Sequence, residues 1–371
     1  MSRRPDVLVL GGGIIGLACG RELAGHGLQV EILERLTAGA EASTAAAGML
    51  TPLAEAPVPG PFFAACRASR DLWSAWAGEI AEESGVPVEF DASGALLAAL
   101  DAAEEAELER YSRAAAALGE PAEEIDLPAL QRSVPDISRR VRRALLLRGE
   151  HRVDNIQACV ALAAAAVRRG VTITHGAEVL MVEREGEGVK VLGKGWQKSA
   201  GLLVLAAGAW SGGIPGLPAL PVRPVRGQML LLGGIDWRWS GIVRGPGVYT
   251  VRRGATGLLV GATVEEAGFW KHSTVAGVGG LLTAVRRLLP GVKDHRLETF
   301  WAGLRPATPD GLPLLGPLPG WPGRRVLAAT GHYRNGILLA PWTARQVADL
   351  VLEGGPGLLA FSPSRFPSGP V

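Results

Sequence analysis

The chain has 371 residues, of which 47% are hydrophobic, so it is long enough for two domains with a substantial core. Its 38 basic and 36 acidic residues give a net charge of +2 without a basic stripe, so nucleic acid is not an expected partner. No apolar run is long enough to span a bilayer, so no membrane association is expected. The three cysteines, Cys19, Cys66 and Cys159, lack disulfide or zinc-site spacing, which favours a reducing cytoplasm and no bound metal.

Residues 6–34 predict a βαβ unit. An apolar strand is followed by the pattern Gly11-x-Gly13-x-x-Gly16, by a helix to about His26, and by a second strand that ends at Glu34. Glycines at this spacing form a tight turn that lets the backbone approach a pyrophosphate, and the acidic residue accepts hydrogen bonds from ribose hydroxyls. The pattern predicts a dinucleotide site but does not distinguish NAD from FAD.

The next part of the chain predicts a ligand-facing loop and an inserted piece. Residues 42–50 are almost all small, which would let their backbone approach a flat ligand closely. A helix is expected over 62–84, then a short strand over 88–90, and the alanine-rich segments 95–118 and 158–167 are interpreted as amphipathic helices. The span 85–140 is interpreted as an insertion.

A second set of strands completes the predicted cofactor sheet. A helix over 155–169 and a strand over 170–174 precede a strand pair over 179–183 and 189–192. The continuous apolar run 202–210 is typical of a parallel strand buried on both faces, and ligands gather at the carboxyl ends of such strands. Ala207 and Gly208, at the end of this run, are therefore expected to face the cofactor.

From residue 225 to 300 the pattern becomes antiparallel, with strands expected over 228–232, 247–252, 257–261 and 296–302 and a helix over 275–289. A last buried strand over 326–329 and a final helix follow. The predicted fold class is α/β (α+β), in which a Rossmann-like cofactor-binding domain is interleaved with a substrate domain built on an antiparallel sheet. The expected domains are 1–85, 141–222 and 305–371 for the cofactor, and 86–140 and 223–304 for the substrate.

The segment 330–341 predicts a glycine-bracketed turn that opens a helix, with His332, Tyr333, Arg334 and Asn335 between Gly331 and Gly336. Backbone N–H groups at a helix start are unpaired and the helix dipole is positive there, so the turn suits negative charge on the pyrimidine end of a reduced flavin. Two nucleotide-type sites this far apart in the chain suggest one long cofactor.

These segments together resemble the FAD-dependent D-amino-acid oxidase and sarcosine oxidase superfamily over essentially the whole chain, and within it the glycine oxidases of bacterial thiamin biosynthesis. The resemblance implies non-covalent FAD, oxidation of an amine to an imine by hydride transfer to the flavin, and hydrogen peroxide as the product of O2. It also implies a homotetramer. The matching segments are Gly11–Gly16 with Glu34, 43–50, 205–210, 225–228, 260–263, 303–306 and 331–337.

Three residues are candidates for the substrate site. Arg305 is a candidate for binding the substrate carboxylate, because a guanidinium donates two parallel hydrogen bonds and stays charged, although an arginine beside a proline can also be a surface residue. The resemblance implies the carboxylate-binding role. The resemblance implies a second hydrogen bond to the carboxylate from Tyr249, for which an ordinary half-buried strand tyrosine is the alternative. Arg334 is expected to touch substrate or cofactor unless it is a solvated arginine. A structural or flavin-edge role is preferred for His332.

The cofactor is expected to contact many residues from both ends of the chain, namely Gly11, Gly13, Ile14, Ile15, Gly16, Glu34, Arg35, Thr44, Ala45, Ala46, Ala47, Gly48, Met49, Val179, Ala207, Gly208, Trp210, Gly227, Arg305, His332, Tyr333, Arg334, Asn335, Gly336 and Ile337. Trp270, Trp301 and Trp342 are interpreted as core residues.

The preferred amine stays open among glycine, sarcosine and small D-amino acids. Gly247 stands where the glycine oxidase pattern has a histidine, and Val264 stands where it has a methionine, so the pocket differs in shape. Three other functions remain as alternatives: a dehydrogenase of the same fold that uses another electron acceptor, a nicotinamide dehydrogenase, and a non-catalytic flavin-binding subunit.

Overall fold

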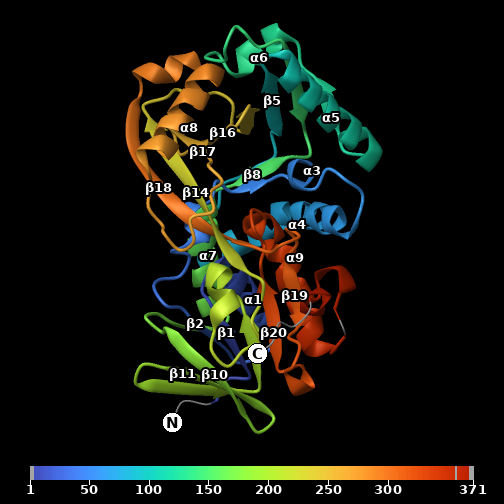
Figure 1. The fold of residues 1–371 in the computed structure, drawn as a ribbon, viewed down its shortest axis with the longest axis vertical. Helices are drawn as coiled ribbons and strands as arrows, with labels where there is room; N and C mark the ends of the chain where they lie inside the picture. Colours follow the sequence, from blue (N-terminus) through green and yellow to red (C-terminus); the bar gives the residue numbers. More distant parts are fainter. Residues whose placement is uncertain (1–3, 356, 367–371) are drawn as a thin grey trace.

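The computed structural model describes residues 4–355 and 357–366. The molecule is elongated, and its two large sheets lie toward opposite ends of the long axis (Figure 1). The smaller of these sheets has six strands, in the order β19 (Leu314–Pro317), β20 (Val326–Thr330), β13 (Leu202–Leu205), β1 (Val7–Leu10), β2 (Val30–Leu33) and β9 (Thr172–Thr174). All neighbours in it are parallel except β19 and β20.

The predicted βαβ unit is confirmed, with helix α1 (Ile14–Gly25) between β1 and β2. Strand β1 has β2 on one side and β13 on the other, so the strand order of the sheet reverses direction at β1. In open α/β sheets, ligands bind in the crevice outside the carboxyl ends of the strands at such a switch point. Gly11 and Ala206, which directly follow β1 and β13, therefore border the expected site.

Helices cover one face of the six-stranded sheet and a small antiparallel sheet covers the other. Helices α1, α4 (Pro61–Ser84), α7 (Asn155–Arg168) and α9 (Gly336–Leu352) share one hydrophobic core, while β10 (Val179–Glu185), β11 (Gly188–Gly193) and β12 (Trp196–Ala200) contribute to another. Helix α4 begins with Pro61 and ends before Gly85, whose φ of +71° is the left-handed conformation that commonly stops a helix.

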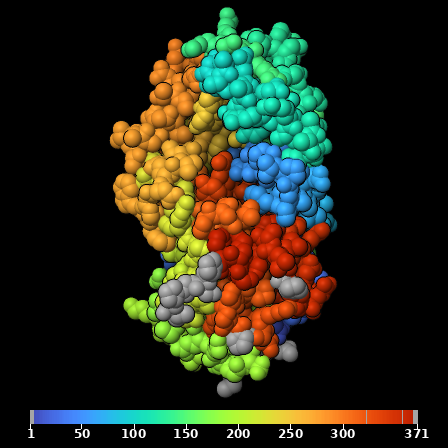
Figure 2. Space-filling model, turned by 45° about the vertical axis from the view of Figure 1, so that its right-hand side comes forward, coloured from blue at the N-terminus to red at the C-terminus, as the bar shows by residue number. Residues whose placement is uncertain are grey.

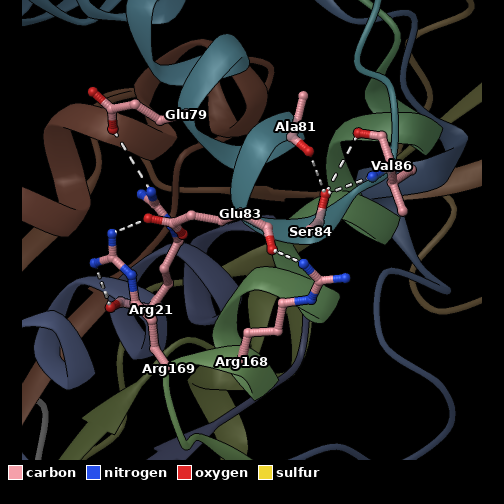
Figure 3. A network of polar contacts seen from close by, with 8 residues as sticks. All are labelled: Arg21, Glu79, Ala81, Glu83, Ser84, Val86, Arg168 and Arg169. Atoms are coloured by element: carbon pink, nitrogen blue, oxygen red, sulfur yellow. Dashed lines mark hydrogen bonds and ion pairs between the residues drawn. The ribbon is translucent and has the colours of Figure 1, made fainter.

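A charge network around the buried Arg21 ties three of these helices together (Figure 3). Arg21 of α1 is only 2% exposed, and its Nε donates to Glu83 of α4 at 2.7 Å. Arg169, which directly follows α7, donates to the same carboxylate, and Arg168 donates to the Glu83 carbonyl at 2.6 Å. Burial raises the pKa of Glu83, but the hydrogen bonds from the two arginines outweigh it and hold the pKa below its ordinary value. The network thus fixes α1, α4 and α7 relative to one another.

Helix α9 contains Pro341, which has no N–H to donate to the carbonyl of Ile337. The indole N–H of Trp73 in α4 donates to that carbonyl at 3.1 Å and to the Leu338 carbonyl at 3.0 Å. The hydroxyl of Ser69 donates to the Leu338 carbonyl at 2.6 Å. The two helices lie side by side in the middle of the molecule, where Figure 2 shows C-terminal segments next to those near residues 50–80.

The larger sheet has eight strands, in the order β18 (Arg296–Ala307), β14 (Arg223–Gly233), β17 (Gly257–Gly261), β16 (Val248–Arg253), β15 (Ile242–Gly245), β5 (Ala95–Ala99), β7 (Arg143–Leu147) and β6 (Ala122–Glu124). Its neighbours are antiparallel except β15 and β5. Helices α8 (Val275–Leu288) and α6 (Leu127–Ser133) pack on one face, and α5 (Ala102–Leu118) contributes to the core on the other.

Short elements connect the two ends of the molecule. A three-stranded sheet is formed by β3 (Met49–Leu50), β8 (His151–Val153) and β4 (Phe90–Asp91). In the sequence, β3 lies between the short helices α2 (Ala42–Ala45) and α3 (Pro52–Glu55). The 3-10 helices are η1 (Gly208–Gly213), η2 (Pro290–Asp294), η3 (Pro322–Arg324), η4 (Leu359–Phe361) and η5 (Pro363–Arg365). In the part of the chain that the structure describes, no helix has the length and apolar character needed to cross a membrane.

Three expectations are corrected. Residues 95–99 form strand β5 and not the start of a helix, because pairing with β15 and β7 buries all five residues and overrides the helix propensity of alanine. The apolar run 202–210 is a strand only to Leu205, and 3-10 helix η1 begins at Gly208. Trp270 is 54% exposed and does not belong to a core.

We propose that the chain divides into the two predicted domains, with one change of boundary. Strand β7 pairs with β5 and β6 in the larger sheet, so we propose that the first substrate-domain segment extends to residue 147 and not to 140. Residues 1–3, 356 and 367–371 of the predicted cofactor domain lie outside the described residues.

Candidate active site

A cavity of about 630 Å³ lies between the six-stranded and eight-stranded sheets. Its walls come from the carboxyl ends of β1, β2 and β13, from the small-residue segment 41–49, from the larger sheet, and from the start of α9. The regions that the sequence analysis singled out separately therefore meet at one site.

The glycine motif forms a close backbone cradle at one end of the cavity. Gly11 has a φ of +105°, and a side chain there would come within 2.8 Å of the Ala206 carbonyl carbon. A side chain at Gly16 would overlap the Gly11 carbonyl, so Gly16 supports the turn without lining the cavity. Gly208 has a φ of +54° and open space where a Cβ would stand. At Gly11 and Gly208 only backbone faces the cavity, which fits the close approach of a pyrophosphate and a flat ring system.

The carboxylate of Glu34 is held in place beside this cradle. One oxygen accepts from Gly12 N–H at 2.7 Å and the other accepts from Leu36 N–H at 2.8 Å. Each carboxylate oxygen has a further lone pair, so both can still accept a hydroxyl. This arrangement fits the ribose of an adenine dinucleotide. The guanidinium of Arg35 lies 4.1 Å from the ring centroid of Trp210, and both residues line the same end of the cavity.

The small-residue segment is anchored by hydrogen bonds at both of its sides. The Ser43 hydroxyl accepts from Ile14 N–H, at the start of α1, at 3.0 Å. Asn155 of α7 donates to the Ser43 carbonyl at 2.7 Å and to the Thr44 carbonyl at 3.2 Å. The Thr44 hydroxyl donates to the Gly39 carbonyl at 2.8 Å and does not line the cavity, whereas Ser43 does. Ser43 was not predicted as a site residue, although it belongs to the small-residue segment that was expected to face the ligand.

Arg305 and Tyr249 project from the larger sheet into the cavity. Gly227 of β14 pairs with Gly303 of β18, and a side chain at Gly227 would overlap the Arg305 guanidinium, so the glycine leaves that group its space. Arg305 donates to the Thr263 carbonyl at 3.1 Å. No carboxylate of residues 4–355 or 357–366 forms an ion pair with it.

The charges around Arg305 and Tyr249 favour an anionic ligand at their end of the cavity. Burial lowers the pKa of Arg305, and the nearby Tyr249 opposes that shift, so the guanidinium still carries its charge at neutral pH. Burial raises the pKa of Tyr249, although Arg305 and Arg334 counteract the effect, so the phenol keeps its proton and can donate it in a hydrogen bond. A desolvated cation next to a neutral donor is suited to binding a carboxylate.

The turn before α9 closes the cavity with a strained backbone. Gly331 has a φ of +73° and Tyr333 has a φ of +49°, which is unusual for a bulky residue. The N–H of Tyr333 donates to the Pro306 carbonyl at 2.8 Å, so the turn is tied to the end of β18. Strain of this kind concentrates at functional sites. The first turn of α9, from Gly336, presents its N–H end to the cavity.

His332 and Arg334 have different surroundings in this turn. His332 is 3% exposed, its Nε2 lies 3.0 Å from the Thr343 hydroxyl, and burial lowers its pKa to about 3, so the ring is neutral at physiological pH. This position suits the structural role preferred for it. Arg334 forms an ion pair with Glu55 at 3.1 Å, and Glu55 also lines the cavity. Glu55 was not predicted, because nothing in its sequence surroundings indicates its partner.

All the predicted site residues line this one cavity except Gly16 and Thr44. The cavity also contains residues that the sequence analysis missed, among them Ser43, Glu55, Met229 and Arg244. Arg244 and Met229 belong to strands that pair with those of Tyr249 and Arg305, a neighbourhood set by sheet register and not by sequence distance. The described residues form no His, Cys, Asp and Glu cluster able to hold a metal ion.

Comparison with known proteins agrees with this site. The bifunctional protein ThiO/ThiG of Synechocystis sp. (strain ATCC 27184 / PCC 6803 / Kazusa) is 38% identical over 99% of this chain, but the chain spans only 55% of that protein. Glycine oxidase of Bacillus licheniformis is 32% identical, with 95% of this chain and 94% of that protein covered. The crystal structure of glycine oxidase from Geobacillus kaustophilus superimposes with a TM-score of 0.92 at 32% identity, over 99% of this chain and 100% of that one.

The family profile for FAD dependent oxidoreductases matches residues 6–350, which include the glycine cradle, Arg305 and the turn before α9. The cavity that these segments line fits the cofactor named in that description. The chain therefore belongs to the FAD dependent oxidoreductase family.

Proposed function

We propose that this protein is an oxidase that converts glycine to its imine, and so to the 2-oxo acid, with reduction of O2 to hydrogen peroxide. One observation carries the proposal: a single cavity contains a dinucleotide cradle, the neutral donor Tyr249, and the cation Arg305, which has no ion-pair partner in the described part of the chain. Full-length similarity to proteins named glycine oxidase supports glycine as the substrate. The similarity to ThiO/ThiG proteins supports a role in the thiazole step of thiamin biosynthesis.

The residues of the chain would bind and orient the amine. Arg305 would bind the carboxylate through its guanidinium fork and Tyr249 would donate a further hydrogen bond, which together fix the α-carbon relative to the ring system. Non-covalently bound FAD supplies the hydride acceptor. No side-chain base is required if the amine binds neutral, and the neutral His332 is consistent with that. The start of α9 would stabilise negative charge at the cavity edge.

Glu34, the glycine cradle and the segment 45–49 would hold the cofactor, while Arg334, paired with Glu55, would close the substrate end. We further propose a cytoplasmic homotetramer. The three cysteines are free and buried, which suits a reducing compartment, and the assembly is the one that the family resemblance implies.

Oxygen uptake and peroxide release by the purified, FAD-loaded protein with glycine, sarcosine and D-alanine would test the proposal. We expect peroxide in equal amounts to the amine consumed, with glycine among the substrates. Flavin that is bleached by glycine under anaerobic conditions but forms no peroxide in air would instead indicate a dehydrogenase. Flavin that no amine reduces would indicate a non-catalytic subunit.

A further inference from the structure

Arg244 of β15 is a cation in the cavity that the proposed reaction does not use. It lies opposite Tyr249 in the β15–β16 ladder, so both side chains are on the cavity face of the sheet. Its Nη1 is buried and has no hydrogen-bond partner among the residues that the structure describes. A buried charged donor without a partner is costly, which makes a ligand group the expected partner.

The acidic residues near Arg244 are engaged elsewhere or neutral. Glu55 is paired with Arg334, and Glu104 is paired with Arg287 at 2.6 Å. Glu150 accepts from Leu53 N–H at 2.8 Å, and burial raises its pKa to about 8 even though Arg244 acts to lower it.

Burial therefore disfavours the ionised form of Glu150, which weakens it as a counter-charge for Arg244. Glu107, the remaining acidic residue that lines this side of the cavity, is exposed on α5. Within the described part of the chain, no carboxylate forms an ion pair with Arg244.

The wall beside Arg244 leaves room for a ligand group. The β15–β16 hairpin turns through Pro246 and Gly247, both of which line the cavity. Gly247 has a φ of +66° and no atom within 4 Å of the place where a Cβ would stand. The ring of Tyr111 from α5 lies 5.9 Å from the Arg244 guanidinium carbon, so the cation is held between the sheet and α5. A polar side chain in place of Gly247 would occupy this space.

We propose that Arg244 binds a second acidic group of the substrate, so that the enzyme accepts amines bearing two carboxylates. This inference rests on the proposed function. One carboxylate would lie on Arg305 and Tyr249 and the other on Arg244, with the reacting carbon between them. The reaction is unchanged: the amine loses two electrons and two hydrogens to form a C=N bond, O2 takes them up as hydrogen peroxide, and water hydrolyses the imine.

The second carboxylate can be attached to the amine nitrogen or to the α-carbon, and two substrates distinguish these cases. We would measure kcat/KM for N-(carboxymethyl)glycine, D-aspartate and glycine with the wild-type protein, Arg244→Gln and the control Arg252→Gln. Arg252 is on the neighbouring strand, with its side chain on the opposite face from Tyr249, and donates to the Gly254 carbonyl at 3.0 Å. In Arg244→Gln, we expect the kcat/KM ratio of the accepted diacid to glycine to fall at least about tenfold. In Arg252→Gln, we expect the ratio to stay constant.

A binding measurement gives a second readout that does not depend on turnover. Succinate should raise the Tm of the FAD-loaded wild-type protein more than acetate does, and Arg244→Gln should remove the difference. If the wild type oxidises glycine but neither diacid, the inference is wrong and the proposed function survives. If Arg244→Gln lowers kcat/KM for all substrates equally, or leaves the ratio unchanged, Arg244 serves only the internal charge balance with Glu150, and the inference is also wrong. If neither glycine nor a diacid is oxidised, both proposals fail.

Discussion

Replacing Gly227 by alanine should weaken substrate binding without removing any functional group. A methyl at this position would overlap both terminal nitrogens of Arg305, so the guanidinium must move away from its present place. A hydrogen bond to a charged group contributes about 1.5–3 kcal/mol, so losing one or two bonds to the substrate carboxylate costs about 3 kcal/mol. Since each 1.4 kcal/mol is a factor of ten, we expect the KM for glycine to rise by about 150-fold.

The assay compares Gly227→Ala, Arg305→Ala and the double variant by steady-state oxygen uptake, with the flavin content of each checked by absorbance. Because the alanine would act through Arg305, it should have no further effect on KM in the Arg305→Ala background. Gly279→Ala in α8 is a matched control, since a Cβ there would meet open space. A KM within about threefold of wild type for Gly227→Ala would refute the reasoning, and so would a further loss in the double variant.

Three other changes test other parts of the molecule. Tyr249→Phe removes one donor to the substrate carboxylate, so we expect KM for glycine to rise by about 10-fold or more with the flavin spectrum unchanged; an unaltered KM would show that the phenol does not contact the substrate. Glu34→Ala removes the acceptor expected for the ribose, so FAD affinity, measured by fluorescence titration, should fall by about 10-fold, and equal affinity would contradict that role. Glu83→Gln should cost about 2 kcal/mol of unfolding free energy at pH 7, because Arg21 and Arg169 lose their ionised partner. The folded-state pKa of Glu83 lies below its ordinary value of 4.5, so the carboxylate contributes stability above that pH and loses it as the pH falls through the folded-state pKa. The difference between Glu83→Gln and wild type in urea denaturation should therefore shrink under acid conditions, and a constant difference would disagree with this assignment.

The local parts of the fold could be predicted because their signals lie within short windows. The glycine motif, α1 and Glu34 fall within 35 residues, and both the turn geometry and the helix start follow from residue type. The turn at Gly331 and the start of α9 could be predicted for the same reason, because their signal lies within a few consecutive residues. Strand β5 could not be predicted in this way, because its alanine and leucine residues become a strand only through pairing with β15 and β7.

The site residues that were missed depend on contacts between distant parts of the chain. Glu55 forms an ion pair with Arg334, which is 279 positions later in the chain. Arg244 lies in the cavity because the β15–β16 register places it opposite Tyr249. Such neighbours follow from the packing of sheets and loops, which one sequence without its relatives does not encode in any local pattern. Arg305 was recognised through the family resemblance, since an arginine before a proline has no distinctive local signal.

The proline in α9 makes the first turn of that helix, which borders the cavity, depend on hydrogen bonds from a neighbouring helix. Trp73 donates to the Ile337 carbonyl that Pro341 leaves open, and both Trp73 and Ser69 donate to the Leu338 carbonyl. The first turn of α9 is therefore attached to α4 as well as to the rest of its own helix. The segment beyond Pro341 packs into the same core through Ala344, Val347 and Ala348, so the helix is held on both sides of the proline. The charge-stabilising first turn of α9 therefore depends for its position on a residue of α4 that lies more than 250 positions earlier in the chain.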